Sequence, residues 1–296
     1  MIQTAHTPGC PGHELVFITA RDRNRRISRD RFTYLRCDAC GLVRLANPPE
    51  DLGKFYPNTY YDLPSRQRLA EIASRDPFKI DLVRRFSKPG RLLEIGPAFG
   101  LFAFQAQQAG YDVSAIEMDA RCCDYLTNEL RIRAMQSDAP QQAIEAFEPH
   151  DIIALWHVIE HLPDPWGLLH AAAAKLRPGG IIVIATPNPL AWQFGLMGAS
   201  WPHVDAPRHL YLLPSRTIVD FARSFGLSSI HKSADDADAR SWNRFGWQRL
   251  LMNACPEKWT ERAAFVLGWA LSAVMAPMDR RPELGSAYTL VLRKDA

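Results

Sequence analysis

The chain has 296 residues, 47% of them hydrophobic, and a formal net charge of +3. A chain of this length and apolar content can form one large domain with its own core and a small additional module. A net charge so close to neutral excludes an argument for nucleic-acid binding from charge alone.

The cysteines and the first residues together indicate a reducing setting. The segment 1–6 lacks the apolar core of a secretory signal. The six cysteines are scattered in a pattern that does not suggest a disulfide scaffold. They are Cys10, Cys37, Cys40, Cys122, Cys123 and Cys255. We therefore expect a cytoplasmic protein.

Two pairs of candidate metal ligands lie near the amino terminus. Cys10 and His13 form one pair, and Cys37 and Cys40 form the other, with two residues inside each pair and 23 residues between the pairs. Thiolate and imidazole ligands in such paired turns are typical of tetrahedral structural zinc sites. The spacing predicts one structural zinc held by these four residues; the alternative is inert thiols beside a surface histidine.

A basic run separates the two pairs. Its arginines are Arg21, Arg23, Arg25, Arg26, Arg29 and Arg31. Such a run beside a zinc ribbon could bind RNA phosphates. Asp22 and Asp30 dilute its charge, however, and no aromatic residue within it offers a stacking surface for bases. We therefore favour a solvated hairpin and consider nucleic acid an unlikely partner.

The segment 47–62 predicts a linker. The proline pair in Asn47-Pro48-Pro49-Glu50 is typical of a stiff boundary. The aromatic residues of 55–61 that follow could close over a ligand or pack against the next domain. We expect a zinc-ribbon-like module and linker over 1–62, a larger domain over 63–296, and a first helix over about 66–86.

The most informative pattern is an apolar strand, 91–95, that contains Glu94 and leads into the turn Gly96–Gly100. A second apolar strand, 111–116, ends in Glu117. In parallel sheets, small residues in such a turn let the backbone approach a ligand, and the second acid accepts hydrogen bonds from ribose hydroxyls. The pattern predicts a nucleotide-type cofactor at the carboxyl ends of these strands.

A dinucleotide is a poorer match to this turn. The dinucleotide fingerprint needs G-x-G-x-x-G, whereas Ala98 replaces the middle glycine and Leu101 stands where the last should be. An acid at position 94 suits a ligand with a positively charged amino-acid end instead.

Further landmarks follow in order. A short strand over 132–136 is followed by Asp138. A fourth strand over 151–156 leads into His157-Val158-Ile159-Glu160-His161-Leu162-Pro163-Asp164-Pro165. A turn at 176–180 then precedes a fifth strand over 181–185. A helix over 215–225, a strand over 227–231 and a last strand over 288–292 complete the predicted sheet.

In these segments the chain resembles the class I S-adenosylmethionine-dependent methyltransferases. Their first motif is acid-x-Gly-x-Gly-x-Gly, the segment 157–165 resembles their "hVLEHLxDP" segment, and 176–180 resembles their "LxPGG" turn. The resemblance implies an α/β, doubly wound, Rossmann-like sheet of seven strands and S-adenosylmethionine as cofactor. The cofactor contacts it implies are Glu94, Gly96, Ala98, Gly100, Glu117, Met118, Asp138 and Trp156.

The amino-terminal pairs also resemble a "CPxC … CxxCG" ribbon that many relatives carry before the catalytic domain. This chain has His13 where the second cysteine of that ribbon usually stands.

The segment His157–His161 has a second interpretation, because H-x-x-E-H is also a signature of zinc peptidases. That chemistry needs both histidines on one face of a helix. Here the segment begins where a buried strand ends, and Pro163 and Pro165 follow it. We therefore favour the methyltransferase interpretation and expect His161 to fix the loop by hydrogen bonding.

Two insertions decorate the carboxyl-terminal half. The first, about 188–213, contains Trp201–Tyr211, which resembles a "W-x-H-x-D-x-P-R-H" loop of the relatives. We expect this loop to form the substrate wall; the alternative is a hydrogen-bonded structural loop. One of His157, His203 and His209 is expected to be the catalytic base.

The second insertion, about 240–281, contains sixteen residues without a charge, 263–278. This stretch is shorter than the roughly 20 residues that span a bilayer. It predicts a core helix or a contact between copies of the chain. With the flanking Trp259, Arg262, Arg280 and Arg281 it also allows a helix lying in a membrane surface.

The resemblance implies a methyltransferase for a small-molecule acceptor, by O-, N- or C-methylation, with a sugar, lipid-linked compound or secondary metabolite as the candidate. The alternatives are a ribosomal-RNA methyltransferase and a non-catalytic cofactor-binding protein. In a small-molecule methyltransferase the sulfonium of the cofactor supplies the reactivity, and the protein mainly positions the acceptor and excludes water.

Overall fold

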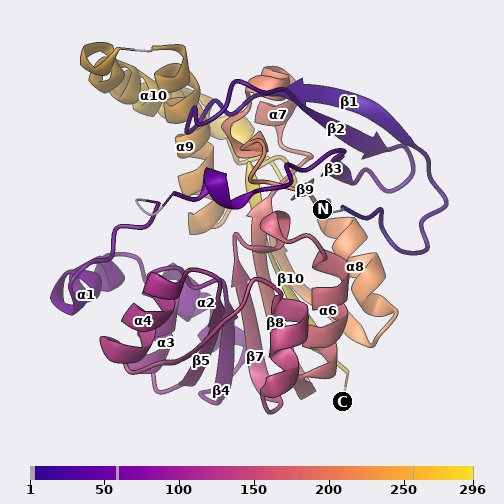
Figure 1. The fold of residues 1–296 in the computed structure, drawn as a ribbon, viewed down its shortest axis with the longest axis vertical. Coiled ribbons are helices and arrows are strands. Elements are labelled where there is room, and N and C mark those ends of the chain that lie inside the picture. Colours follow the sequence, from indigo (N-terminus) through magenta and orange to yellow (C-terminus); the bar gives the residue numbers. More distant parts are fainter. Residues whose placement is uncertain (1–3, 58–59, 256, 296) are drawn as a thin grey trace.

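A computed structural model describes residues 4–57, 60–255 and 257–295, apart from the side chains of Lys258 and Trp259. The predicted roles of Trp259 and of residues 1–3 and 58–59 therefore lie outside the described part. Two sheets organise the fold (Figure 1).

The larger sheet has seven strands in the order β10-β11-β8-β7-β4-β5-β6. They are β4 (Arg91–Ile95), β5 (Asp112–Glu117), β6 (Arg133–Gln136), β7 (His150–Trp156), β8 (Leu176–Pro187), β10 (Leu227–Ser233) and β11 (Ala287–Lys294). Strands β4 to β8 are parallel, and β11 is antiparallel to both its neighbours. This confirms the predicted doubly wound α/β sheet.

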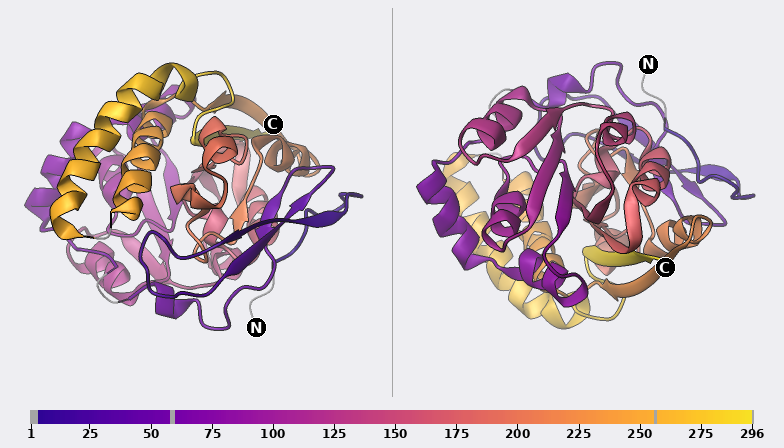
Figure 2. Two further views of the ribbon diagram at one scale, coloured as in Figure 1. Left: turned by 90° about the horizontal axis from the view of Figure 1, so that it is seen from above. Right: turned by 90° about the horizontal axis from the view of Figure 1, so that it is seen from below.

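Helices cover both faces of this sheet (Figure 2). The α-helices are α1 (Arg66–Arg75), α2 (Phe78–Phe86), α3 (Leu101–Gln108), α4 (Ala120–Asn128), α5 (Pro140–Ala143), α6 (Pro165–Ala174), α7 (Trp192–Met197), α8 (Ser215–Arg223), α9 (Ala237–Ala254) and α10 (Lys258–Asp279). Burial on both faces explains the continuous apolar runs of the central strands. In β4, Leu92 packs into one core cluster and Leu93 into the other.

The predicted single helix over 66–86 is wrong: it is two helices, α1 and α2. Asp76 has φ −134° and ends α1, and Pro77 follows it. A residue before proline is disfavoured in the helical region, so the chain turns here and restarts the helix at Phe78.

The smaller sheet is antiparallel and has the order β1-β2-β3-β9. Its strands are β1 (Glu14–Ala20), β2 (Phe32–Cys37), β3 (Val43–Leu45) and β9 (Tyr211–Leu212). The last of these comes from the first insertion, so the sheet crosses the predicted boundary at 62/63. Tyr34 of β2 and Leu93 of β4 also belong to one core cluster. The boundary itself stays a prediction.

The second insertion is a helical hairpin of α9 and α10. The buried carboxylate of Asp279 holds it to the rest of the protein, accepting hydrogen bonds from Trp192 Nε1 (2.7 Å), Gln193 Nε2 (2.8 Å) and Trp247 Nε1 (2.9 Å). Among the described residues, no helix combines the length and apolar character that crossing a membrane requires.

Candidate functional site

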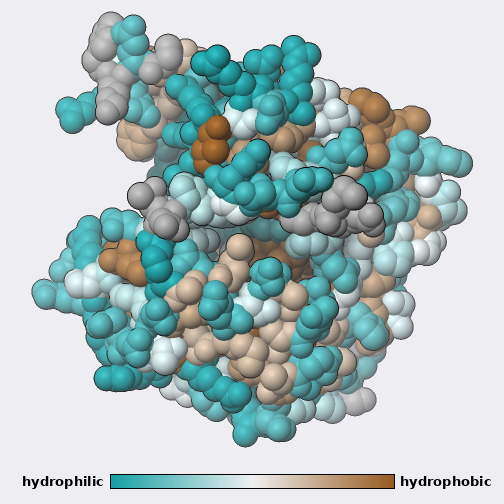
Figure 3. All heavy atoms as spheres, in the orientation of Figure 1, coloured by the Kyte–Doolittle hydropathy of each residue, from teal (hydrophilic) through white to brown (hydrophobic). Residues whose placement is uncertain are grey.

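A cavity of about 450 Å³ opens at the carboxyl ends of β4 and β5. The strand order reverses at β4 and β7, which is where α/β sheets bind ligands. Residues 50–53, Tyr56, Tyr60 and Tyr61 and the chain following β7 form the other walls. Figure 3 shows the surface hollowed between the upper part of the molecule and the part that carries α1 and α4.

Small residues bring the β4–α3 turn close to the cavity. Gly96, Ala98 and Gly100 have φ values of 67°, 52° and 78°. A Cβ on Gly96 would lie 2.6 Å from Cγ2 of Val158, and a Cβ on Gly100 would lie 2.5 Å from Cδ2 of Leu126. Glycine is therefore required at both positions for conformational and steric reasons.

The Glu117 carboxylate connects the ends of two neighbouring strands. It accepts hydrogen bonds from the amides of Ala98 (2.9 Å), Met118 (2.7 Å) and Asp119 (2.9 Å). Burial raises its pKa above the usual glutamate value, although these three amides oppose that shift. The bond to Ala98 also stabilises the left-handed backbone there.

The predicted cofactor residues divide into two groups. Gly96, Glu117, Met118 and Asp138 line the cavity. Glu94, Ala98, Gly100 and Trp156 are not among the residues that line it.

Glu94 and Trp156 are buried, and each carries a side-chain atom without a hydrogen-bond partner, Oε2 of Glu94 and Nε1 of Trp156. Burial raises the pKa of Glu94 to about 8, and the nearby charge of Lys79 opposes the rise. The Lys79 Nζ atom lies 4.9 Å from the Trp156 ring centroid. Sequence reasoning missed Lys79, whose only signal is a cation on the helix before the first parallel strand.

His157 lines the cavity, but both of its ring nitrogens face carboxylates. Nε2 lies 2.7 Å from Oδ2 of Asp238, and Nδ1 lies 3.6 Å from Oε1 of Glu160. Burial alone would lower the pKa of His157, but these two acids outweigh it and raise the pKa to about 9. These contacts favour the protonated imidazole, and the place of His157 among the three candidate bases stays a prediction.

Glu160 is fully buried and accepts a hydrogen bond from Thr186 Oγ1 (3.0 Å). Burial would raise the pKa of Glu160, yet the contact with His157 lowers it to about 2. Asp238 lies at the start of α9, just before the predicted bounds of the second insertion, and was not predicted. The contacts among His157, Glu160 and Asp238 therefore join α9 to the carboxyl end of β7.

His203 and His209 are not among the described residues that line the cavity, and their predicted catalytic role stays a prediction. Nε2 of His203 donates to the carbonyl oxygen of Trp242 (3.0 Å), and Nδ1 of His209 donates to the carbonyl oxygen of His203 (2.8 Å). Burial lowers the pKa of His203 to about 3. Both rings lie behind the cavity wall.

Their loop is held by a buried ion-pair network. Nη2 of Arg208 lies 2.9 Å from Asp22 and 2.7 Å from Asp205, and Asn24 donates to Asp205 (2.6 Å). Trp201 is also fully buried. The loop 201–211 is therefore held by buried hydrogen bonds and ion pairs, as the structural alternative expects, and its role as the substrate wall stays a prediction. The arginine-rich hairpin is anchored to this loop through Asp22 and Asn24.

His161 is the second imidazole that lines the cavity. Its Nδ1 atom lies 3.0 Å from the hydroxyl of Tyr56 and 3.0 Å from the carbonyl oxygen of Arg208. Burial lowers its pKa to about 4, so the ring is neutral at pH 7. Tyr60 and Tyr61 line the same cavity. Ligand atoms of Glu160, His161 and His209 also lie within 4.8 Å of one another, a spacing that a metal ion could occupy.

The predicted thiol cluster forms with a different histidine. Ligand atoms of His6, Cys10, Cys37 and Cys40 lie within 4.8 Å of one another. The Sγ atoms of Cys10 and Cys37 are 3.7 Å apart, and Cys40 Sγ lies 3.9 Å from Nε2 of His6.

The structure does not place His13 in this cluster, so the predicted ligand set that includes it stays a prediction. Its side chain is 86% exposed, and its Nδ1 lies 3.9 Å from Oδ2 of Asp38. The His13 amide donates to Asp38, and β1 begins at the next residue. The chain thus directs this ring into solvent.

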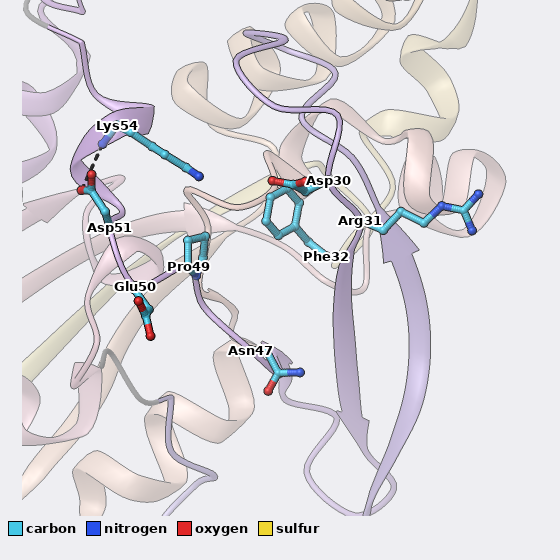
Figure 4. A pocket seen from close by; sticks show the side chains of 8 residues that line it. All are labelled: Asp30, Arg31, Phe32, Asn47, Pro49, Glu50, Asp51 and Lys54. Atoms are coloured by element: carbon cyan, nitrogen blue, oxygen red, sulfur yellow. Dashed lines mark hydrogen bonds between the residues drawn. The ribbon is translucent and has the colours of Figure 1, made fainter.

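A second hollow, of about 470 Å³, adjoins the cavity through Glu50 and Asp51. In Figure 4, Lys54 extends toward Asp30, whereas Arg31 points away. The hollow contains no predicted site residue.

The comparisons with known proteins agree with this fold. A family model described as a methyltransferase domain matches residues 66–232, more than half of the chain. The ubiquinone biosynthesis O-methyltransferase of Stutzerimonas stutzeri (strain A1501) is 30% identical over 125 residues, which cover 40% of this chain and 54% of that protein. Its counterpart from Xanthomonas campestris pv. campestris (strain B100) is 28% identical over 153 residues, covering 49% and 63%. The chain spans about half to two thirds of the length of these relatives.

Solved structures show the same fold at low identity. A putative sarcosine dimethylglycine methyltransferase from Galdieria sulphuraria has a TM-score of 0.51 and 12% identity, with 81% of this chain and 96% of that chain covered. The cyclopropane synthase MmaA2 from Mycobacterium tuberculosis has a TM-score of 0.50 and 16% identity, with 73% and 83% covered. The family model, the strand order and the turn after β4 lead to one conclusion: the chain belongs to the methyltransferase domain family, among the class I S-adenosylmethionine-dependent methyltransferases.

Proposed function

We propose that this protein binds S-adenosylmethionine in the cavity at β4 and β5 and transfers its methyl group to a hydroxyl of a small-molecule acceptor. The observation that carries the proposal is the position of this cavity, which has the glycine turn and Glu117 on one side and three tyrosines with His161 on the other. The first side suits a nucleoside cofactor, and the second suits a small organic acceptor.

The residues present fit the cofactor. Glu117 would accept from its ribose hydroxyls, Asp138 would lie near its adenine, and the turn from Gly96 to Gly100 would lie beneath its methionine end. The unpartnered Oε2 of Glu94 is suited to an ammonium group. The charge of Lys79, close to Glu94, is suited to the carboxylate of the same amino-acid end.

The cofactor supplies an activated methyl group, and the chain's own task is to hold the acceptor and accept its proton. His161 is the proposed base. The bond from Nδ1 to the Arg208 carbonyl leaves the lone pair on Nε2, and the lowered pKa keeps the ring neutral. Tyr56, Tyr60 and Tyr61 would exclude water and bind the acceptor's apolar surface.

The names of the curated relatives support oxygen as the methylated atom, since both are ubiquinone biosynthesis O-methyltransferases. The tyrosine wall supports an acceptor with a planar, largely apolar body. The carboxylates of Glu50, Asp51 and Asp138 line the cavity with Glu117, which supports an acceptor without negative charge.

We also propose a structural zinc ion held by His6, Cys10, Cys37 and Cys40. Three thiols and one imidazole within 4.8 Å are a typical tetrahedral ligand set. The ion would connect residues before β1 to the β2–β3 turn and would leave no position open for chemistry.

The function is tested by measuring binding and turnover separately. Calorimetry with S-adenosylmethionine, S-adenosylhomocysteine and a nicotinamide dinucleotide tests the cofactor, and methyl transfer to phenolic, alcohol and amine acceptors tests the reaction. Tight binding of the first two ligands and methylated products from hydroxyl acceptors are expected. Preference for the dinucleotide, or binding without turnover of any acceptor, would contradict the proposal; the second result would favour a non-catalytic cofactor-binding protein.

A further inference from the structure

The outer face of α10 is apolar and uncovered. Its exposed large residues are Phe265, Val266, Leu267, Trp269 and Val274, with exposed fractions between 49% and 71%. These five are a large part of the exposed large apolar residues of the described chain, and they fall within ten positions of one helix. An exposed apolar cluster of this kind marks an interaction surface.

The orientation of this face is fixed by packing. On the inner side of α10, Ala264 and Gly268 are buried against α9. A Cβ on Gly268 would lie only 2.4 Å from the Cα atom of Gln248, so the two helices are in close contact there. The buried Asp279 then fixes the carboxyl end of α10. The helix cannot rotate to hide its outer face without breaking these contacts.

Arginines flank this face at both ends. Arg280 pairs with the half-buried Asp235, its Nε 3.1 Å from Oδ1, and the half-buried Glu261 precedes Arg262, so Arg262 and Arg281 are the flanking cations on which the argument rests. Every residue from 262 to 281 is described by the structure, and the exposed charged residues among them are Arg262, Arg280 and Arg281. The single acid in this range, Asp279, is buried. The apolar face therefore has arginines at both ends and no exposed carboxylate between them.

The geometry points to a peripheral membrane-binding site: we infer that the outer face of α10 lies in the surface of a bilayer that contains anionic lipids. An apolar helix face flanked by arginines inserts its side chains to the level of the acyl boundary while the cations contact lipid phosphates. Trp269 has the amphipathic ring typical of this depth. Figure 1 and the left view of Figure 2 show α10 at an outlying edge of the molecule, where a flat surface can approach it.

Vesicle cosedimentation with the full chain tests this inference. Vesicles of phosphatidylcholine alone are compared with vesicles that also contain phosphatidylglycerol. We expect binding to the anionic vesicles that weakens with added salt. The double variant Val266→Glu, Trp269→Glu should bind about tenfold more weakly or worse, because both side chains would lose their apolar burial. Arg262→Glu with Arg281→Glu should remove the preference for phosphatidylglycerol.

Matched controls separate this surface from general stickiness. Val16 on β1 is 72% exposed and lies on the other sheet, so Val16→Glu should leave vesicle binding unchanged. Thermal unfolding reports whether each variant is folded, and Val266→Ser with Trp269→Ser replaces the glutamate variant if that variant unfolds. Turnover of a soluble acceptor should be equal in all of them, which keeps this test independent of the proposed function.

Three outcomes would overturn the inference. They are absence of binding to either kind of vesicle, an equal loss of binding in Val16→Glu, and a wild-type dimer in light scattering that Val266→Glu, Trp269→Glu converts to a monomer. The last would assign the face to a second copy of the chain.

Discussion

The Nε2 atom of His157 lies 2.7 Å from Oδ2 of Asp238, although 81 positions separate them in the chain. His157 has φ 56°, a left-handed conformation that is uncommon for a residue other than glycine. The contact with Asp238 on α9, and that with Glu160, hold the ring in place at the end of β7. The same contacts that place the histidine at the cavity also favour its protonated form.

This relationship predicts a pH-dependent contribution to stability. The folded-state pKa of about 9 lies above the ordinary histidine value of 6.5, so the imidazolium contacts stabilise the fold below about pH 6.5 and this stabilisation disappears as the pH rises through about 9. His157→Gln should lower the free energy of unfolding by about 2–3 kcal/mol at pH 6 and by clearly less at pH 10. Urea denaturation at both pH values measures this. An equal loss at both would mean that charge does not cause it.

The cofactor assignment predicts a large effect of Glu117. Glu117→Ala should weaken S-adenosylmethionine binding by about 1.5–3 kcal/mol, the scale for hydrogen bonds to charged groups. Lys79→Ala should also weaken binding, and it leaves the three amide contacts of Glu117 intact. Calorimetry measures both, with the exposed Glu148→Ala as the control that should bind like wild type. Unchanged affinity in Glu117→Ala would contradict the placement of the ribose.

The thiol cluster predicts which histidine binds zinc. Purified protein should contain one zinc per chain, His6→Ala should lose it or hold it more weakly, and His13→Ala should keep it, since the His13 ring is 86% exposed beside Asp38. Elemental analysis before and after dialysis against a chelator distinguishes the two variants. The reverse pattern would restore the ligand set that the sequence spacing predicts.

The position of His161 predicts the base. His161→Asn should lower kcat by about 10²–10⁴-fold with little change in S-adenosylmethionine affinity. The exposed His170→Asn is the control and should retain full activity. Because burial lowers the pKa of His161 to about 4, wild-type kcat should fall only in acid, near that value. Full turnover in His161→Asn at saturating acceptor would exclude it as the base.

His203 and His209 provide a further test of the same wall. Both donate to carbonyl oxygens behind the cavity, so their substitution should affect stability before it affects chemistry. His203→Asn is expected to lower the melting temperature while kcat stays within a few-fold of wild type at a temperature where the variant is folded. A selective loss of kcat without a change in stability would return His203 to the catalytic residues.

The sequence by itself determined the parts of this protein that local chemistry fixes. The turn from Gly96 to Gly100 needs positive φ and close backbone approach, and only small residues supply both. The turn can therefore be recognised from the sequence. Glu117 at the end of β5 could also be recognised along the chain, because an acid that follows an apolar strand in this kind of sheet accepts hydrogen bonds from ribose hydroxyls. Buried parallel strands must be continuously apolar, which made the order of β4, β5 and β7 predictable.

Only the tertiary structure decided where each histidine side chain lies. His6, and not His13, meets the thiols because the chain enters β1 immediately after His13 and turns that ring outward. His161 lies on the cavity wall while His203 lies behind it, a difference set by how the loop 201–211 packs and not by residue type. Asp238 reaches His157 from the start of α9, 81 positions away. Spacing along a sequence carries no information about such contacts, because the direction of each side chain is set by packing between elements that are distant in the chain.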